Sequence, residues 1–529
     1  MILRRAPLTL DRTTVARIPA SLQEVSLSRW FKYPLFAALL ALLAGPSPAQ
    51  NQSPVALDTS ETLFTVLTAI NTCGYDQDLA VSDRLRSKVR SEVTRARQVS
   101  QAAEEATQAM CQYYQEHQQP DPSKTLAQYV SLALYLTPPP ALTAKVKDAD
   151  MPPDAALVLG ILPLLQKFYE AVGLHSIWDG DREAVAALTG RYHEALAKML
   201  FDTEIYLKLP SSSRLGRDFT VFIDPMGASG QTNARNYGSD YYVVISPGPG
   251  AGLKMDQIRH TYLHYLLDPL ALKYPASMEQ LKPLLGSVKG APMDESFKTD
   301  VSLLATECLI RAVEARMIGS SRTPETERSQ LVERSVEQGF ILTPYFYQAL
   351  VRFEKSPAGL RIAYGELIGG IDVRKEQKSA AQIKFASKAD QELLHLSRPT
   401  EAKLLITAEQ RLSSGDSEAA RKLAQQALDE KREDPGRALF ILAQVATMNR
   451  DMQGARNYFQ QALDVAREPK VVAWSHIYLA RIYDDEGLAE QAKTEYQAAL
   501  AVNGGPEQAK QAAQKGLAAF GAEKPSERP

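Results

Sequence analysis

The sequence predicts a mainly α-helical protein with one small β-sheet and an array of paired helices at its end. Apolar residues recur at three- and four-residue spacing over most of the chain, which is the period of helices packed on a core. Two short stretches, Asp218–Asp224 and Asp240–Ser246, are instead rich in β-branched and aromatic residues and predict strands. In the last third, a pattern of alanines returns after 35 and then 37 residues, which predicts a repeat of helix pairs.

Composition and charge are those of a globular protein. The 529 residues are 45% apolar and 23% charged, and the formal net charge is −2. A chain of this length can form about two to four domains with real cores. Nucleic-acid binding usually requires a basic face, so we expect no nucleic-acid partner.

The N-terminal segment has the order of a secretory signal peptide. Arg29 and Lys32 precede the apolar segment 34–45, which is followed by the small residues of "PSPAQ". We expect cleavage after Ala49, which makes 1–49 a leader and the body an exported protein, periplasmic or secreted. An uncleaved anchor is the alternative. The apolar segment is shorter than the about 20 residues that span a bilayer, and we expect no membrane span in the mature protein.

The chain has only three cysteines, Cys73, Cys111 and Cys308. An exported protein with so few does not depend on a disulfide framework. Cys73 and Cys111 could form a disulfide, but the sequence alone does not show whether they do. Cys308 lies in an apolar run and is expected to be a buried thiol.

The first part of the chain is expected to be helical from Glu61 to about Leu209. The two strands follow, separated by a loop rich in Gly and Asn. Helical periodicity resumes at about Met255, and a second helix is expected over Ser302–Ile318, with further helices to about Ile371.

The last third resembles the tetratricopeptide repeat, a helix–turn–helix unit of about 34 residues. We assign 399–520 to such repeats, with a capping helix at the end; an ordinary helical bundle is the alternative. The first helices of stacked repeats line a groove, which we expect to bind a protein or peptide partner. Helices that only pack on the preceding domain are the other possibility. The small positions on which the repeat depends are Ala408, Ala420 and Ala427, then Ala443, Ala455 and Ala462, then Ala480, Ala492 and Ala499.

Two histidines four residues apart, His260 and His264, lie in the first helix after the strands. On a helix they share one face, so both imidazoles can bind one ion. Glu307 on the second helix offers a carboxylate as third ligand, and such a set suits zinc. The spacing is that of the peptidase motif H-E-x-x-H, but Thr261 stands where the catalytic glutamate belongs and cannot act as a base. A helix with two half-buried histidines is the alternative.

The segment "HTYLHYLLDPL" resembles the H-E-F-S-H-S-F-V-N-P segment of an uncharacterised bacterial family of secreted, gluzincin-like metallopeptidases. "LLQKFYEAVGL", "FTVFIDP", "NYGSDYYVVISP" and "ECLIRAVEARM" resemble further segments of that family. The resemblance covers about Glu61 to Ile371 and implies a zincin-like domain, to which we assign 50–371. It matches His260, His264 and Glu307 to the three metal ligands.

Two positions depart from that family, and the order of strand and helix adds an expectation about the sheet. Thr261 replaces the family's catalytic glutamate, and Asp268 stands where the family has an asparagine before Pro269. The strand Tyr241–Ile245 precedes the histidine helix, as the substrate-binding edge strand does in zincins, and is expected to be unpaired on one side.

Other side chains near the motif are weaker candidates. Asp268 could reach a metal, but it precedes Pro269, where a helix normally ends, which favours a local role at the helix terminus. Glu314 lies two turns after Glu307, and the Arg-Ala pair that follows Glu307 favours the latter. Tyr262 and Tyr265 could donate to an oxyanion, but tyrosines on a helix usually pack. The remaining histidines have no partner at metal spacing: His117, His175, His193, His395 and His476.

We therefore predict an exported protein in which a zincin-like domain binds zinc but is catalytically impaired. A linker at 372–398 would join it to the tetratricopeptide repeats. An active zinc metallopeptidase with a non-standard base is one alternative. A structural scaffold subunit without metal is the other.

Overall fold

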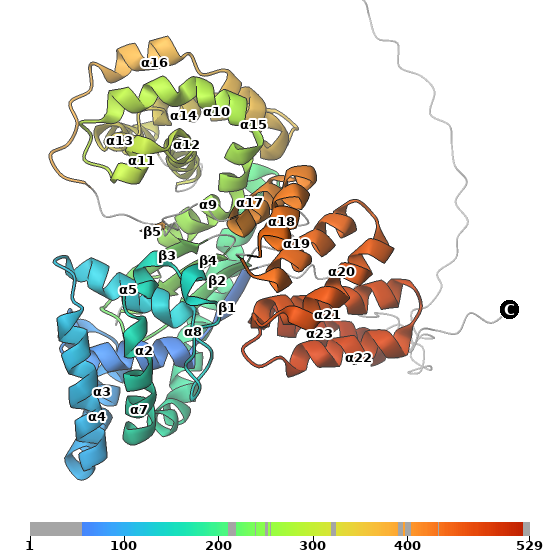
Figure 1. Cartoon of the computed structure of the whole chain (residues 1–529). Coiled ribbons are helices and arrows are strands. Elements are labelled where there is room, and N and C mark those ends of the chain that lie inside the picture. Colours follow the sequence, from blue (N-terminus) through green and yellow to red (C-terminus); the bar gives the residue numbers. More distant parts are fainter. Residues whose placement is uncertain are drawn as a thin grey trace, which may run out of the picture. The chain divides into compact units, whose positions relative to one another are not determined.

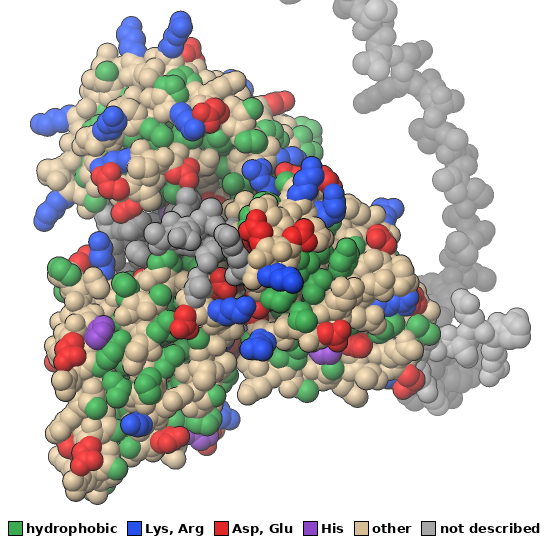
Figure 2. Space-filling model, in the orientation of Figure 1, with side chains coloured by type: hydrophobic (Ala, Val, Ile, Leu, Met, Phe, Trp, Pro, Cys, Tyr) green, Lys and Arg blue, Asp and Glu red, His purple; other side chains and the backbone are tan. Residues whose placement is uncertain are grey.

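The computed structural model describes most of the chain after the predicted leader. The leader and its cleavage site lie outside the described residues, which are 55–209, 218–237, 240–248, 252–253, 255–318, 324–389, 395–396, 404–431 and 433–521. The protein is mainly helical with a small sheet, as the sequence predicts. No helix of the described chain combines the length and the apolar character that a membrane crossing needs. On the face drawn in Figure 2, basic and acidic side chains are interspersed.

The first helices pack around a core on one side of the sheet. Polar side chains start several of them, because a Ser or Asp oxygen accepts a hydrogen bond from an otherwise unpaired N–H of the first turn. A disulfide joins Cys73 to Cys111 and so ties the end of α2 to α4. The elements are α2 (Glu61–Thr72), η1 (Leu79–Val81), α3 (Arg84–Val99), α4 (Gln101–Glu116), α5 (Pro122–Leu134), η2 (Asp148–Asp150), α6 (Pro153–Ala156), η3 (Leu159–Ile161), α7 (Leu162–Val172) and α8 (Leu174–Leu207).

The sheet has the order β1-β2-β4-β3-β5. Its strands are β1 (Val55–Asp58), β2 (Asp218–Ile223), β3 (Thr232–Tyr237), β4 (Asp240–Ile245) and β5 (His395–Leu396). Strands β1, β2 and β4 run parallel, whereas β3 is antiparallel to β4 and β5 is parallel to β3. Alternate residues of β4 pack into two different cores, one on each face of the sheet. Val243 and Ile245 face the core that contains α9, while Val244 faces the core of α2 to α7.

The prediction that β4 is an edge strand is wrong. It pairs with β2 on one side and with β3 on the other, along its whole length. The polar segment Thr232–Tyr237, expected as a loop, forms β3 because β4 satisfies its backbone groups through the antiparallel ladder. Strand propensity could not show this, since only Thr232 and Tyr237 favour a strand and the four residues between them are Asn, Ala, Arg and Asn.

Helix α9 (Met255–Lys273) carries both histidines and continues past Pro269, so the expected end before that proline is also wrong. Proline removes one helical hydrogen bond. Burial of Leu266, Leu267 and Leu270 on both sides of the proline offsets that loss. The following elements complete this core: α10 (Pro275–Leu281), η4 (Lys282–Val288), α11 (Glu295–Thr299), α12 (Val301–Met317), α13 (Glu325–Glu337), α14 (Thr343–Lys355), α15 (Leu360–Gly369) and α16 (Val373–Ala380).

The last third consists of helices that pack against their neighbours in chain order (Figure 1). They are α17 (Leu404–Ser414), α18 (Ser417–Glu430), α19 (Pro435–Met448), α20 (Met452–Val465), α21 (Pro469–Asp485), α22 (Ala489–Ala501) and α23 (Glu507–Gly521). All nine alanines that define the sequence repeat are at most 2% exposed. The turns of the first and third pairs hold Gly415 and Gly487 at positive φ, a region that glycine enters without steric cost.

These helices also contact the earlier part of the chain. Helix α17 packs against α9, and Arg411 donates to the carbonyl of Leu272. Helix α23 packs against β1, and Gln508 donates to the Thr220 hydroxyl of β2. The segment predicted as a linker contributes α16 and β5, and the buried Ala380 of α16 packs on the core around α9.

Candidate metal site

The structure brings His260, His264 and Glu307 together. The histidines occupy one face of α9, and Glu307 projects from α12, which packs against α9. The three residues are 2%, 1% and 1% exposed. One ligand atom from each lies within 4.8 Å of the other two, so the group has the geometry to hold a metal ion. It is the one such group of three or more His, Cys, Asp or Glu side chains among the described residues.

A single oxygen of Glu307 faces both imidazoles. Its Oε2 lies 3.0 Å from Nε2 of His264 and 3.5 Å from Nε2 of His260. The other oxygen, Oε1, accepts a hydrogen bond of 2.6 Å from Nε of Arg311. The Arg311 guanidinium is itself held over the ring of Phe340, 3.8 Å from its centroid. Glu307 therefore presents one oxygen to the site and is oriented through the other.

Carboxylates hold the far nitrogens of both rings. Nδ1 of His260 lies 3.0 Å from Oε1 of Glu314, and Nδ1 of His264 lies 3.0 Å from Oδ1 of Asp268. Tyr241 of β4 donates a hydrogen bond of 2.7 Å to Oδ2 of Asp268. Such partners fix the ring orientation and make the opposite nitrogen the ligand atom. The two side chains considered as alternative ligands thus orient the histidines and lie outside the three-residue group.

The electrostatics of the group are set by its carboxylates and Arg311. Burial by itself lowers the pKa of His260, but Glu314 and Glu307 outweigh it and raise that pKa to about 9. In the same way Asp268 and Glu307 overcome burial and raise the pKa of His264 to about 10. Burial raises the pKa of Glu307, but Arg311 and the two histidines hold it well below its usual range. Without metal, both rings are protonated at neutral pH.

Thr261, which stands where the peptidase motif has its catalytic glutamate, cannot replace that base. Thr261 is completely buried, and its hydroxyl donates to the carbonyl of Gln257 in its own helix, at 3.2 Å. Tyr262 donates to Glu204 at 2.5 Å and stacks on Tyr265, so both tyrosines pack in the core as the sequence favours. The sequence did not predict that Arg311 orients Glu307 or that Tyr241 supports Asp268. The position of Arg311 one turn after Glu307 is a signal for the first contact, since i and i+4 residues meet on a helix.

The remaining described histidines are not part of a metal group. His117 contacts the carbonyl of Tyr113, His175 contacts Glu61, and His476 contacts Glu495. Cys308 is buried, as expected, and burial raises the pKa of its thiol to about 12.

Comparisons with known proteins returned no family model, no curated protein and no solved structure that matches this chain.

Proposed function

We propose that His260, His264 and Glu307 bind a divalent metal ion, zinc, in a zincin-like domain that no longer catalyses hydrolysis. The observation that carries the proposal is the group itself: three buried ligand-type side chains, with one ligand atom of each within 4.8 Å of the other two. Two imidazoles and one carboxylate are a donor set that suits zinc and leaves a fourth position open. Similarity to secreted gluzincin-like proteins remains the proposed origin of this arrangement.

Distances and charges both support a zinc ion. Two atoms bound to zinc at about 2.0–2.1 Å in tetrahedral geometry lie about 3.3 Å apart. The measured separations of 3.0 and 3.5 Å lie on either side of that value. Zinc would replace the two imidazolium protons by two positive charges on one ion, so the buried group would keep its total charge.

Loss of catalysis is supported by the side chains that surround the rings. Thr261 has no carboxylate to accept a proton from a bound water. Glu314 and Asp268, the remaining acids close to the histidines, lie on their Nδ1 side, away from the nitrogens that face Glu307. We therefore propose a binding or scaffold role rather than a peptidase.

One observation favours the alternative of a metal-free scaffold. In the absence of an ion, Glu307 already accepts hydrogen bonds from His264 and Arg311, so the buried polar groups are satisfied. Elemental analysis of purified protein decides between the two. The metal proposal expects zinc in the protein and its loss in His264→Ala, with His476→Ala, a half-buried histidine outside the group of three, as a matched control. If purified protein contains no zinc and takes up none on titration, the metal proposal is wrong and the metal-free scaffold is the function that remains.

The C-terminal helices are proposed to be tetratricopeptide repeats that bind a protein or peptide. The nine buried alanines and the order of helix packing support this. Deletion of 400–529 should release a co-purifying partner, and a partner that stays bound would contradict the role.

Export is proposed from the signal-like segment, and the disulfide between Cys73 and Cys111 supports it, because such bonds persist in oxidising compartments. N-terminal sequencing should find Gln50 first. Soluble cytoplasmic protein that retains residues 30–45 would contradict export.

A further inference from the structure

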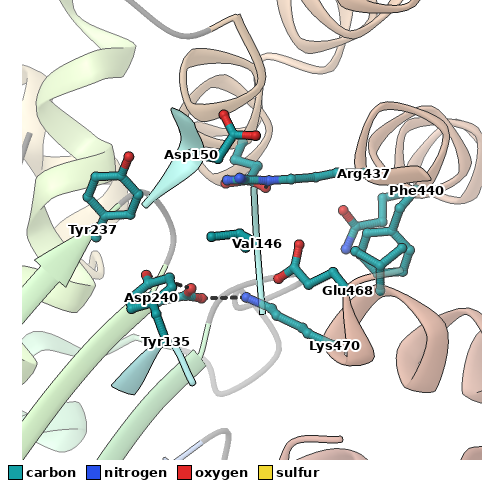
Figure 3. Close-up of a pocket in the computed structure, with 12 residues that line it drawn as sticks. Tyr135, Val146, Asp150, Tyr237, Asp240, Arg437, Phe440, Glu468 and Lys470 are labelled. Atoms are coloured by element: carbon teal, nitrogen blue, oxygen red, sulfur yellow. Dashed lines mark hydrogen bonds and ion pairs between the residues drawn. The ribbon is translucent and has the colours of Figure 1, made fainter. Parts of the chain in front are cut away.

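A cavity of about 280 Å³ lies away from the metal site, between the sheet and the C-terminal helices. Its walls come from the turn between β1 and α2, the end of α5, strands β2 and β4, and the starts of α21 and α23. A smaller pocket shares Tyr135, Asp240, Glu468 and Lys470 with it and so adjoins it. Figure 3 shows this smaller pocket, with Glu468 between Arg437 and Lys470 and directed into it. The volume is just below the roughly 300–1,000 Å³ of typical small-molecule sites.

Many charged groups around the cavity already have partners. Lys470 forms an ion pair with Asp240, which also accepts a hydrogen bond from the Tyr135 hydroxyl. In the smaller pocket, Arg437 donates to Glu409 at 2.6 Å. On the outer side, Lys510 lies 3.8 Å from Glu507. Glu61 likewise accepts from the Tyr169 hydroxyl and contacts His175.

Three charged groups that line the cavity lack such partners among the described residues. Lys145 donates only to the carbonyl of Leu134, at 3.1 Å, and has no carboxylate within 4.0 Å. Glu468 is the N-cap residue of α21, but its side chain makes no capping hydrogen bond. Its carboxylate forms no hydrogen bond or close ion pair with a described residue, although the charges of Arg437 and Lys470 act on it. Asp58 accepts only from the N–H of Thr59. All three residues are half-buried. Removing charges from water without partners costs free energy, so their presence in one cavity needs an explanation.

The pKa values agree with this picture. Burial raises the pKa of Glu468 to about 7 and also raises the pKa of Asp58. Burial lowers the pKa of Lys145, although Asp240 and Glu468 act in the opposite direction. A ligand that supplies two positive groups and one negative group would favour the charged forms of all three side chains.

We propose that this cavity binds a free basic amino acid, whose carboxylate pairs with Lys145 and whose two cationic groups pair with Glu468 and Asp58. A simple anion would meet one ammonium and two carboxylates. A diamine would leave Lys145 without a partner, and a neutral amino acid would leave one carboxylate without one. L-Lysine and L-arginine carry the complementary set of charges, and both are small enough for the cavity.

Calorimetric titration of the full chain with L-lysine and L-arginine tests the proposal. Either ligand should bind saturably, while L-norleucine, which lacks the side-chain amine, and cadaverine, which lacks the carboxylate, should bind at least about tenfold more weakly. Lys145→Met and Glu468→Gln should each weaken L-lysine binding by about tenfold or more. Lys124→Met, an exposed lysine of α5, should leave it unchanged.

Each variant is checked by its circular dichroism spectrum and by bound metal, which the cavity does not influence directly. Asp58→Asn is a second carboxylate variant should Glu468→Gln misfold. No heat of binding with L-lysine or L-arginine up to about 10 mM, well above a millimolar Kd, would overturn the proposal. Equal binding of L-norleucine, or unchanged binding in folded Lys145→Met, would overturn it as well.

Discussion

Asp268→Asn is the sharpest test of how the metal site is built. The residue does not belong to the group of three, yet its Oδ1 holds Nδ1 of His264 at 3.0 Å and its Oδ2 accepts from Tyr241 at 2.7 Å. The substitution removes the negative charge and keeps the shape. Loss of such a partner of a ligand histidine typically weakens metal binding by about 10- to 100-fold. That corresponds to about 1.4–2.7 kcal/mol, since each tenfold change is about 1.4 kcal/mol.

Two further substitutions are expected to weaken zinc binding less than Asp268→Asn does. Tyr241→Phe removes only the outer hydrogen bond and should cost about tenfold or less, because the Asp268 charge remains beside His264. Asp256→Asn is the matched control on the same helix, since its side chain is 94% exposed and pairs only with Arg259.

The assay is competition for zinc against a chromophoric chelator at constant pH. The order of zinc affinity should be Asp256→Asn equal to wild type, then Tyr241→Phe, then Asp268→Asn. Wild-type affinity in Asp268→Asn would refute the argument that this carboxylate orients His264 for metal.

Further predictions concern catalysis and stability. Thr261→Glu should restore slow peptidase activity if a substrate cleft is present, because a positioned base contributes about 10²- to 10⁴-fold; a fluorogenic peptide library measures it against wild type. Since burial raises the pKa of Glu468 from 4.5 to about 7, the wild type loses stability as pH rises between these values, whereas Glu468→Gln does not. In thermal unfolding the variant should match wild type near pH 4.5 and exceed it at pH 8 by up to about 3 kcal/mol. Cys73→Ser opens the disulfide to Cys111, whose sequence separation is 38, and should cost about 4 kcal/mol in denaturant unfolding under oxidising conditions. Ala455→Leu overfills a fully buried position and should cost about 1–3 kcal/mol by the same measurement, and an unchanged midpoint would contradict close helix packing there.

The three candidate ligands could be named from the sequence because helical geometry is local. Residues four apart share a face on any helix, so His260 and His264 required only that α9 exist. Glu307 was chosen by register on a second helix, and the packing of α12 on α9 then brought it to the histidines. The small positions of the C-terminal helices were visible for the same reason: each pair repeats its own local pattern.

The surroundings of the site depended on long-range contacts. Glu314 became the partner of His260 through the docking of α12 on α9, whereas Arg311 meets Glu307 one turn away on α12 itself. Strand β4 is not at an edge because β3 pairs with it. The polar sequence of Thr232–Tyr237 did not predict that strand. Two separate segments, Val55–Asp58 and His395–Leu396, then joined the sheet at its two ends.

The sequence by itself determined the helical character, the repeat at the end and a pair of histidines able to share one ion, because periodicity and i,i+4 spacing act within single elements. Only the tertiary structure decided that Glu314 holds the ring of His260, how the sheet is ordered, and that Lys145, Glu468 and Asp58 line one cavity. These features join residues that are tens to hundreds of positions apart. Their proximity follows from burial of apolar surface by whole helices and strands, a driving force that is non-directional and leaves no local pattern.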